Sequence, residues 1–107
     1  MTPMRFLVVG TGSVGTRHCR NLVADRHAVM AWDTDPAHLD EVVSDAPSVE
    51  IAGSLDEALS AKPDATLICT PPALHVKIAR KAIDSGAHLY IEKPLAVTTS
   101  DALALVV

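Results

Sequence analysis

Short apolar runs alternate with helix-like stretches along the whole chain of 107 residues. Strands that alternate with helices build βαβ units, in which the strands run parallel and the crossovers are right-handed. The pattern therefore predicts an α/β fold with a doubly wound parallel sheet. The runs expected to form the strands are Arg5–Val9, Ala28–Trp32, Val49–Ala52, Ala65–Cys69 and His88–Ile91.

The segments between the strands carry helix signals. Asp35 is a good N-cap residue, and Pro36 suits the first helical position because no N–H is needed there. Ser54-Leu55-Asp56-Glu57 is a capping box that opens a short helix, which we expect to end near Lys62-Pro63.

Two longer helices follow from the spacing of apolar residues. The first is expected over Ser13–Asp25 and the second over Leu74–Ser85, with Gly86 as its stop signal. Residues four apart in the sequence share one face of a helix. The expected inner-face residues are Val14, His18 and Leu22 in the first helix and Leu74, Ile78 and Ala82 in the second.

Composition excludes several classes of protein. Hydrophobic residues make up 49% of the chain and aromatic residues only 3%, so the core must be aliphatic, as in a buried parallel sheet. The net charge is −4 and there is no basic stripe, which argues against nucleic-acid binding. No apolar run has the length of a membrane span or of a signal-peptide core, and we therefore expect a cytoplasmic protein.

The cysteines and histidines show no metal-ligand spacing. Cys19 and Cys69 lie far apart, and we interpret both as small buried residues rather than a disulfide or a metal pair. His27, His38 and His88 share no zinc-binding pattern, so we expect no metal site. His38 is expected either near a bound adenine or at a solvated position of its helix.

The organisation of the chain indicates one domain over residues 1–107. Thr98 is a candidate cap for a last helix, through Asp101. The final run, residues 102–107, is apolar and has no stop signal. We therefore expect that the chain is truncated within the helix after the fifth strand and that a substrate domain is missing.

The sharpest motif is the loop Gly10-Thr11-Gly12-Ser13-Val14-Gly15, which follows the first strand and opens the first long helix. In this context a G-x-G-x-x-G string is the Rossmann fingerprint for a dinucleotide. Gly10 permits the tight turn, Gly12 leaves room for a pyrophosphate, and Gly15 lets the helix pack closely on the strand. The N–H groups of Ser13 and Val14 then face the phosphates at the positive end of the helix dipole.

Asp33 ends the second strand, near the offset of about 20 residues at which the ribose-binding acid of this fingerprint is expected. Its carboxylate accepts hydrogen bonds from the ribose hydroxyls and repels a 2′-phosphate. Thr34 and Asp35 follow it, so no Arg or Lys is adjacent to neutralise such a phosphate. We therefore expect the cofactor to be NAD rather than NADP, with Thr34 beside it.

Two further segments follow strand ends, where ligands bind in an open α/β sheet. Thr70, Pro71 and His75 follow the fourth strand, whereas Glu92-Lys93-Pro94 follows the fifth. We expect all six residues at the bound cofactor. His75 could instead be a partly buried polar side chain at the start of its helix, and Lys93 a solvated charge at a strand end. A lysine at such a place can donate to a hydroxyl or a carbonyl and, if partly desolvated, titrate nearer neutrality.

These motifs, together with Arg17-His18 on the first helix, resemble the Gfo/Idh/MocA family, which is named after glucose–fructose oxidoreductase, inositol dehydrogenase and rhizopine catabolism. The resemblance spans essentially the whole chain. Its most specific part is Glu92-Lys93-Pro94, because most other dinucleotide folds lack this element. The resemblance implies a two-domain oxidoreductase that uses NAD(P) to oxidise or reduce a carbinol on a sugar, cyclitol or related compound.

The resemblance also implies roles for single residues. Lys93 would be the catalytic residue, in contact with the reacting oxygen and the nicotinamide ribose, and Pro94 would shape its turn. Thr70, Pro71 and His75 would line the nicotinamide side of the cleft. An Asp and a His from a C-terminal α/β domain would complete the site, and that domain would form the usual homo-oligomer.

An alternative from another class is a stand-alone nucleotide-sensing module, such as the regulatory Rossmann domain of an ion channel. Such a module needs no lysine after the fifth strand, so Lys93-Pro94 favours the oxidoreductase. A scaffold with a degenerate site would need a broken glycine loop, whereas the loop over residues 10–15 is intact.

Overall fold

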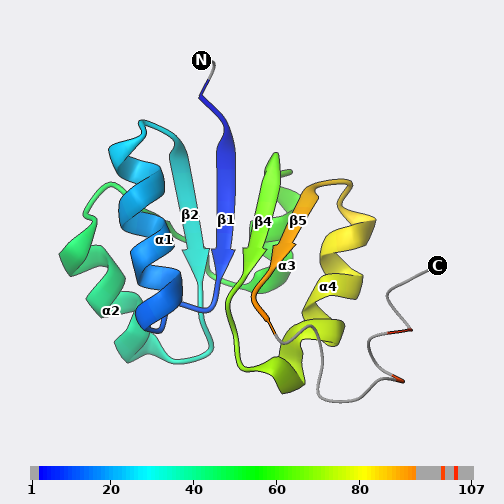
Figure 1. Cartoon of the computed structure of the whole chain (residues 1–107). Helices are drawn as coiled ribbons and strands as arrows, with labels where there is room; N and C mark the ends of the chain where they lie inside the picture. The colour runs from blue at the N-terminus through cyan, green and yellow to red at the C-terminus, as the bar shows by residue number, and fades with distance from the viewer. Residues whose placement is uncertain (1–2, 94–99, 101–102, 104–107) are drawn as a thin grey trace.

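The computed structural model of the chain describes residues 3–93, 100 and 103. Its five strands form one parallel sheet in the order β3-β2-β1-β4-β5 (Figure 1). The predicted α/β fold with a doubly wound parallel sheet, the Rossmann fold, is therefore confirmed. The strands are β1 (Arg5–Val9), β2 (Ala28–Trp32), β3 (Glu50–Ile51), β4 (Ala65–Ile68) and β5 (His88–Ile91).

Helices cover the two faces of the sheet in pairs. α1 and α2 pack on one face and enclose a cluster that includes Val8, Ala31 and Leu67. α3 and α4 pack on the other face, and a single 3₁₀ turn, η1, precedes α4. The bounds are α1 (Ser13–Ala24), α2 (Pro36–Asp45), α3 (Leu55–Ser60), η1 (Pro72–Leu74) and α4 (His75–Asp84).

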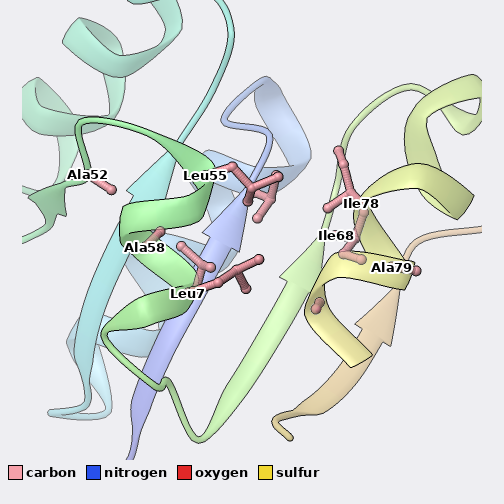
Figure 2. Close-up of a cluster of buried hydrophobic side chains, with 10 residues drawn as sticks. Leu7, Ala52, Leu55, Ala58, Ile68, Ile78 and Ala79 are labelled. Carbon is pink, nitrogen blue, oxygen red and sulfur yellow. The ribbon is translucent and has the colours of Figure 1, made fainter. Parts of the chain in front are cut away.

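The core beneath α3 and α4 is built from aliphatic side chains, as the composition predicted. Figure 2 shows Leu7 of β1 and Ile68 of β4 meeting Leu55 of α3 and Ile78 of α4. Leu7 and Ile68 are fully buried. Burying a Leu or Ile side chain stabilises the fold by roughly 1.5–3 kcal/mol, so this layer fixes the sheet against both helices.

The helix ends match their sequence signals. The Asp35 carboxylate accepts the backbone N–H of Ala37 at 3.0 Å, and the Ser54 hydroxyl accepts that of Glu57 at 3.0 Å. Gly86, just after α4, has a φ of +81°, which is the left-handed conformation expected of a helix stop. The expected last helix, capped by Thr98 through Asp101, lies outside the described residues.

The inner faces of the two long helices differ from the sequence prediction. α1 buries Gly15, Thr16 and Cys19, whereas Val14, His18 and Leu22 are only partly buried. The helix approaches the sheet so closely at Gly15 that small residues face it, and the apolar spacing alone did not reveal this.

The second long helix also begins later than predicted. Its first residue is His75, and Leu74 is 37% exposed in the preceding 3₁₀ turn instead of facing the core. Ile78 and Ala82 are buried as expected.

The third strand is shorter than Val49–Ala52 because β3 lies at the sheet edge and pairs only with β2. Glu50 and Ile51 form the strand and are exposed, while Val49 and Ala52 on either side are buried.

No helix among the described residues is long and apolar enough to cross a membrane.

The turn between β1 and α1 brings backbone atoms into direct contact. A Cβ placed on Gly10 would lie 2.7 Å from the carbonyl carbon of Cys69 and 2.7 Å from the backbone nitrogen of Thr70. A Cβ on Gly15 would overlap the carbonyl oxygen of Gly10. The carboxyl ends of β1 and β4 can therefore come together only because both positions lack a side chain.

Replacing Gly10 tests this packing constraint, with Gly86 as a matched control. Both glycines have a positive φ, +93° and +81°, but nothing lies within 4 Å of a Cβ at Gly86. Gly86→Ala should cost about 1 kcal/mol from backbone strain alone, whereas Gly10→Ala should cost at least about 3 kcal/mol because backbone must also move. Urea unfolding followed by circular dichroism measures both. Equal losses would contradict the close approach of the two loops.

Candidate functional site

The carboxyl ends of β1, β2 and β4 meet at one edge of the sheet, where the strand order reverses between β1 and β4. Backbone hydrogen bonds continue past the strand ends and align the loops. The N–H of Gly10 donates to the Trp32 carbonyl at 2.8 Å, and that of Cys69 donates to the Val9 carbonyl at 2.8 Å. An open α/β sheet forms its ligand crevice at such a reversal.

A cleft of about 560 Å³ opens at this edge. Its size falls within the range of about 300–1,000 Å³ that is typical of small-molecule sites. Its walls come from the glycine loop, the residues after β2, the residues after β4 and the first turns after them. The lining residues are Gly10, Gly12, Ser13, Val14, Trp32, Asp33, Thr34, Asp35, His38, Cys69, Thr70, Pro71, Leu74 and Ile78.

The glycine loop presents open space at its centre. No atom lies within 4 Å of a Cβ placed on Gly12, although Gly10 and Gly15 on either side have no room at all. The Thr16 hydroxyl donates to the Thr11 carbonyl at 2.9 Å and fixes the loop on α1. The first N–H groups of α1 have no partner within the helix, so an anion can approach them over Gly12.

Asp33 is held rigidly at the end of β2. Its Oδ2 accepts the backbone N–H of Thr11 at 2.7 Å, and its Oδ1 accepts the backbone N–H of Asp35 at 2.8 Å. The His38 Nδ1 lies 3.2 Å from Oδ2. The Asp33 side chain is only 10% exposed, yet it lines the cleft.

The same hydrogen bonds keep Asp33 charged. Burial raises the pKa of the Asp33 carboxyl, but the backbone N–H groups of Thr11 and Asp35 and the bond to His38 lower it more, so that the pKa lies below its ordinary value. The edge of the cleft therefore carries an anionic acceptor at neutral pH. Ribose hydroxyls are donors that suit it.

The loop after β4 offers a polar atom without a partner. The Thr70 Oγ1 is buried and has no hydrogen-bond partner among the described residues, although Thr70 lines the cleft. Such an unpaired buried hydroxyl is uncommon in folded proteins. Burial raises the pKa of the neighbouring Cys69 thiol to about 12, so this thiol stays neutral and behaves as an apolar wall.

His75 stands behind this loop rather than in the cleft. Its side chain is 1% exposed, and its Nε2 lies 2.7 Å from the Thr70 carbonyl oxygen. The contact fixes the turn that presents Thr70 and Pro71 to the cleft. The sequence did not distinguish this buried position from a direct contact with a ligand.

The residues after β5 lie beside α1. The Glu92 Oε1 is 3.2 Å from His18 Nε2 and 3.4 Å from the Tyr90 hydroxyl. The hydrogen bond with His18 lowers the pKa of the Glu92 carboxyl below its ordinary value. Lys93 is exposed, and the expected Pro94 lies outside the described residues.

Most of the predicted site residues meet in the cleft, and four described ones do not line it. Gly15 is buried beneath the loop, His75 lies behind the Thr70 turn, and Glu92 and Lys93 lie beyond β5. Sequence reasoning missed several lining residues because they carry no motif and are recognisable only as neighbours of strand ends. These are Trp32, Asp35, Leu74 and Ile78.

The sequence left two interpretations of His38 open, and the structure places it in the cleft wall beside Asp33.

No group of three or more His, Cys, Asp or Glu side chains in the described part of the chain is arranged to hold a metal ion. The open space at Gly12 and the anionic Asp33 instead fit a dinucleotide, which has a pyrophosphate and ribose hydroxyls to bind. The fold and the cleft together define a dinucleotide-binding Rossmann domain.

Comparison with known proteins identifies the family. The model of the Gfo/Idh/MocA oxidoreductase family, described as an NAD-binding Rossmann fold, matches residues 4–107. The chain therefore belongs to this family, as its motifs indicated.

Two of the proteins that the chain resembles are dehydrogenases. It is 35% identical to the 1-carboxy-3-chloro-3,4-dihydroxycyclohexa-1,5-diene dehydrogenase of Comamonas testosteroni, over 92% of this chain and 25% of that protein. The structure of UDP-N-acetylglucosamine 3-dehydrogenase from Acidithiobacillus ferrooxidans matches with a TM-score of 0.87 and 33% identity, over 99% and 34% of the two chains.

A second similar structure contains a nicotinamide cofactor. The WlbA dehydrogenase of Bordetella pertussis, in complex with NADH and UDP-GlcNAcA, matches with a TM-score of 0.84 and 28% identity, over 98% of this chain and 33% of that one. The chain thus spans about a third or less of the length of the relatives it matches.

The hydrogen bonds of Asp33 predict a dependence of stability on pH. A carboxyl whose pKa is lowered by folding stabilises the protein above its unfolded pKa, and this contribution is lost as the pH falls through the folded pKa. Asp33→Asn should therefore lower the free energy of unfolding by about 1–2 kcal/mol near neutrality. The difference from the wild type should shrink below about pH 4.

Urea unfolding at a series of pH values measures this difference. Asp40→Asn, at an exposed position of α2, is the control and should change stability by less than about 0.5 kcal/mol. A difference between wild type and Asp33→Asn that stays constant down to about pH 3 would show that the charge of Asp33 does not contribute.

Proposed function

We propose that the cleft binds NAD, with the pyrophosphate over Gly12 and the adenosine ribose on Asp33. The observation that carries the proposal is the combination of open space at Gly12 with a fixed carboxylate at the end of β2. The N–H groups at the start of α1, from Ser13 and Val14, would receive the phosphate oxygens. Thr70 and Pro71 line the same cleft, which supports a nicotinamide ribose or amide beside them.

The cofactor preference follows from charge. Asp33 is anionic, Asp35 follows it closely, and no Lys or Arg among the described residues lines the cleft at this end. A 2′-phosphate at the adenosine ribose would meet two carboxylates, whereas the free hydroxyls of NAD would donate to Asp33. We therefore propose NAD rather than NADP as the cofactor, with Thr34 beside the ribose.

The whole protein is proposed to be an NAD-dependent dehydrogenase that acts on a secondary alcohol of a sugar, cyclitol or related compound. The names of its relatives support this class of substrate. NAD accepts a hydride from such a carbinol. Lys93, after β5, is proposed to hydrogen-bond the reacting oxygen, and Glu92 and Pro94 to shape its turn. The acid–base partner would come from the part of the relatives that this chain does not span.

The family match and Lys93 favour this oxidoreductase over the nucleotide-sensing module that the sequence left open. Homo-oligomerisation and a cytoplasmic location stay predictions of the sequence.

The direct test of the proposal is a titration of the chain with NADH, followed by the fluorescence of Trp32. This indole lines the cleft, so saturable quenching is expected. A folded chain that shows no response to NADH would count against the proposed site.

Substitution of Gly12 tests the position of the pyrophosphate. Gly12→Val should leave the fold intact because the position has an ordinary φ of −66° and open space around it. The branched side chain should fill the space over the loop and weaken NADH binding by at least about tenfold, or 1.4 kcal/mol. Gly12→Ala, with a single added methyl group, should weaken it less. NADH affinity that is unchanged in folded Gly12→Val would refute the assignment of the loop.

Substitution of Asp33 tests the ribose position. Asp33→Ala removes the acceptor for the ribose hydroxyls and the charge that repels a 2′-phosphate. NADH should bind more weakly, and NADPH should bind better relative to NADH. The ratio of the dissociation constant of NADPH to that of NADH should therefore fall by roughly tenfold. Calorimetric titration with both nucleotides measures the ratio. If the ratio does not move, Asp33 is not the residue that selects the cofactor.

A further inference from the structure

His38 occupies the ribose end of the cleft, in the first turn of α2. Its Nδ1 lies 3.2 Å from Oδ2 of Asp33, and its Nε2 lies 3.8 Å from Oδ2 of Asp35. The imidazole ring thus bridges the two carboxylates that a 2′-phosphate would meet. Its side chain is 42% exposed, so protons exchange freely with solvent.

All the charged groups that act on His38 in the described structure are acids. Asp33 belongs to the end of β2, Asp35 is the cap of α2, and Glu41 lies one turn further along α2. The glycine loop contributes only Thr11, whose neutral N–H and hydroxyl point to the same Asp33 oxygen. The hydrogen bond to Asp33, together with these charges, raises the pKa of His38 above its ordinary value of about 6.5.

We propose that His38 is a specificity-determining residue, whose proton sets how strongly the ribose end of the cleft rejects a 2′-phosphate. The proposal rests on the proposed binding of NAD in this cleft. When His38 is neutral, Asp33 and Asp35 act as two uncompensated negative charges. When His38 is a cation, it neutralises part of this charge and places an N–H donor where a phosphate oxygen can accept it.

The chemistry of the two cofactors makes the effect selective. NAD presents only ribose hydroxyls at this end, and these donate to Asp33 whether or not His38 carries a proton. NADP presents a phosphate, which is a dianion above about pH 6. The charge of His38 therefore acts on the affinity for NADP far more than on the affinity for NAD. Because the site is partly exposed, water and salt screen the effect to a few-fold change.

The test compares the wild type with two variants at about pH 7 and about pH 9. The 2′-phosphate is a dianion at both pH values, whereas the protonated fraction of His38 falls between them. In each case the ratio of the dissociation constants of NADPH and NADH is measured by calorimetry. His38→Gln keeps a neutral hydrogen-bonding side chain, and His38→Lys keeps a cation at both pH values. Circular dichroism checks that each variant is folded.

The proposal predicts how the ratio of the dissociation constants of NADPH and NADH differs among the three proteins. The ratio for the wild type should rise roughly two- to fivefold between the two pH values. His38→Gln should have the high ratio at both pH values, and His38→Lys the low ratio at both. A wild-type ratio that does not change with pH, or equal ratios for the Gln and Lys variants, would overturn the role of His38.

The same data separate this inference from the proposal on which it depends. If the three proteins bind NADH but their ratios do not differ, only the role of His38 fails and the NAD site stands. If none of the three folded proteins binds NADH, the proposed site and the role of His38 fail together.

Discussion

The site depends on one backbone contact, the packing of Gly15 in α1 against the carbonyl of Gly10 at the end of β1. A side chain at either position would push α1 away from the sheet or β1 away from β4, because Gly10 also touches the backbone at Cys69 and Thr70. This contact aims the first N–H groups of α1 over the strand ends. It also brings the loop after β4 to the opposite wall, so the cleft exists only while both glycines are present.

Asp33 contributes both to the stability of this edge of the sheet and to the chemistry of the cleft. Its carboxylate accepts N–H groups from the glycine loop and from the start of α2, so it fastens two separate turns to the end of β2. Backbone donors use some of the lone pairs of this carboxylate, which can accept further hydrogen bonds and lines the cleft. A ligand that donates hydroxyls completes a network that is already ordered, and little entropy is lost on binding. A site of this kind discriminates between ligands by their charge and geometry and does not need to rearrange.

The sequence predicted the sheet, the glycine loop and Asp33 because these depend on local rules. Alternation of strands and helices predicts a parallel sheet, and a positive φ at Gly10 or a cap at Asp35 is a property of a few adjacent residues. The inner face of α1 could not be predicted in this way. Which residues face the sheet depends on how closely Gly15 lets the helix approach, and this is a tertiary contact. The positions of the two histidines could not be predicted for the same reason. His75 is buried behind Thr70 and His38 is partly exposed beside Asp33, and both positions follow from packing rather than from spacing in the sequence.

The contact between His18 and Glu92 extends this reasoning to the turn after β5. α1 begins at the glycine loop, and His18, little more than one turn into it, meets the residue that precedes Lys93. The 3.2 Å contact, with Tyr90 beside it, ties the turn after β5 to the same helix that presents its N-terminus over Gly12. A shift of α1 would therefore displace both the glycine loop and the backbone that carries Lys93. Because one helix contacts both segments, the separation of the glycine loop and Lys93 is a property of the fold, and the two ends of the proposed site are positioned together.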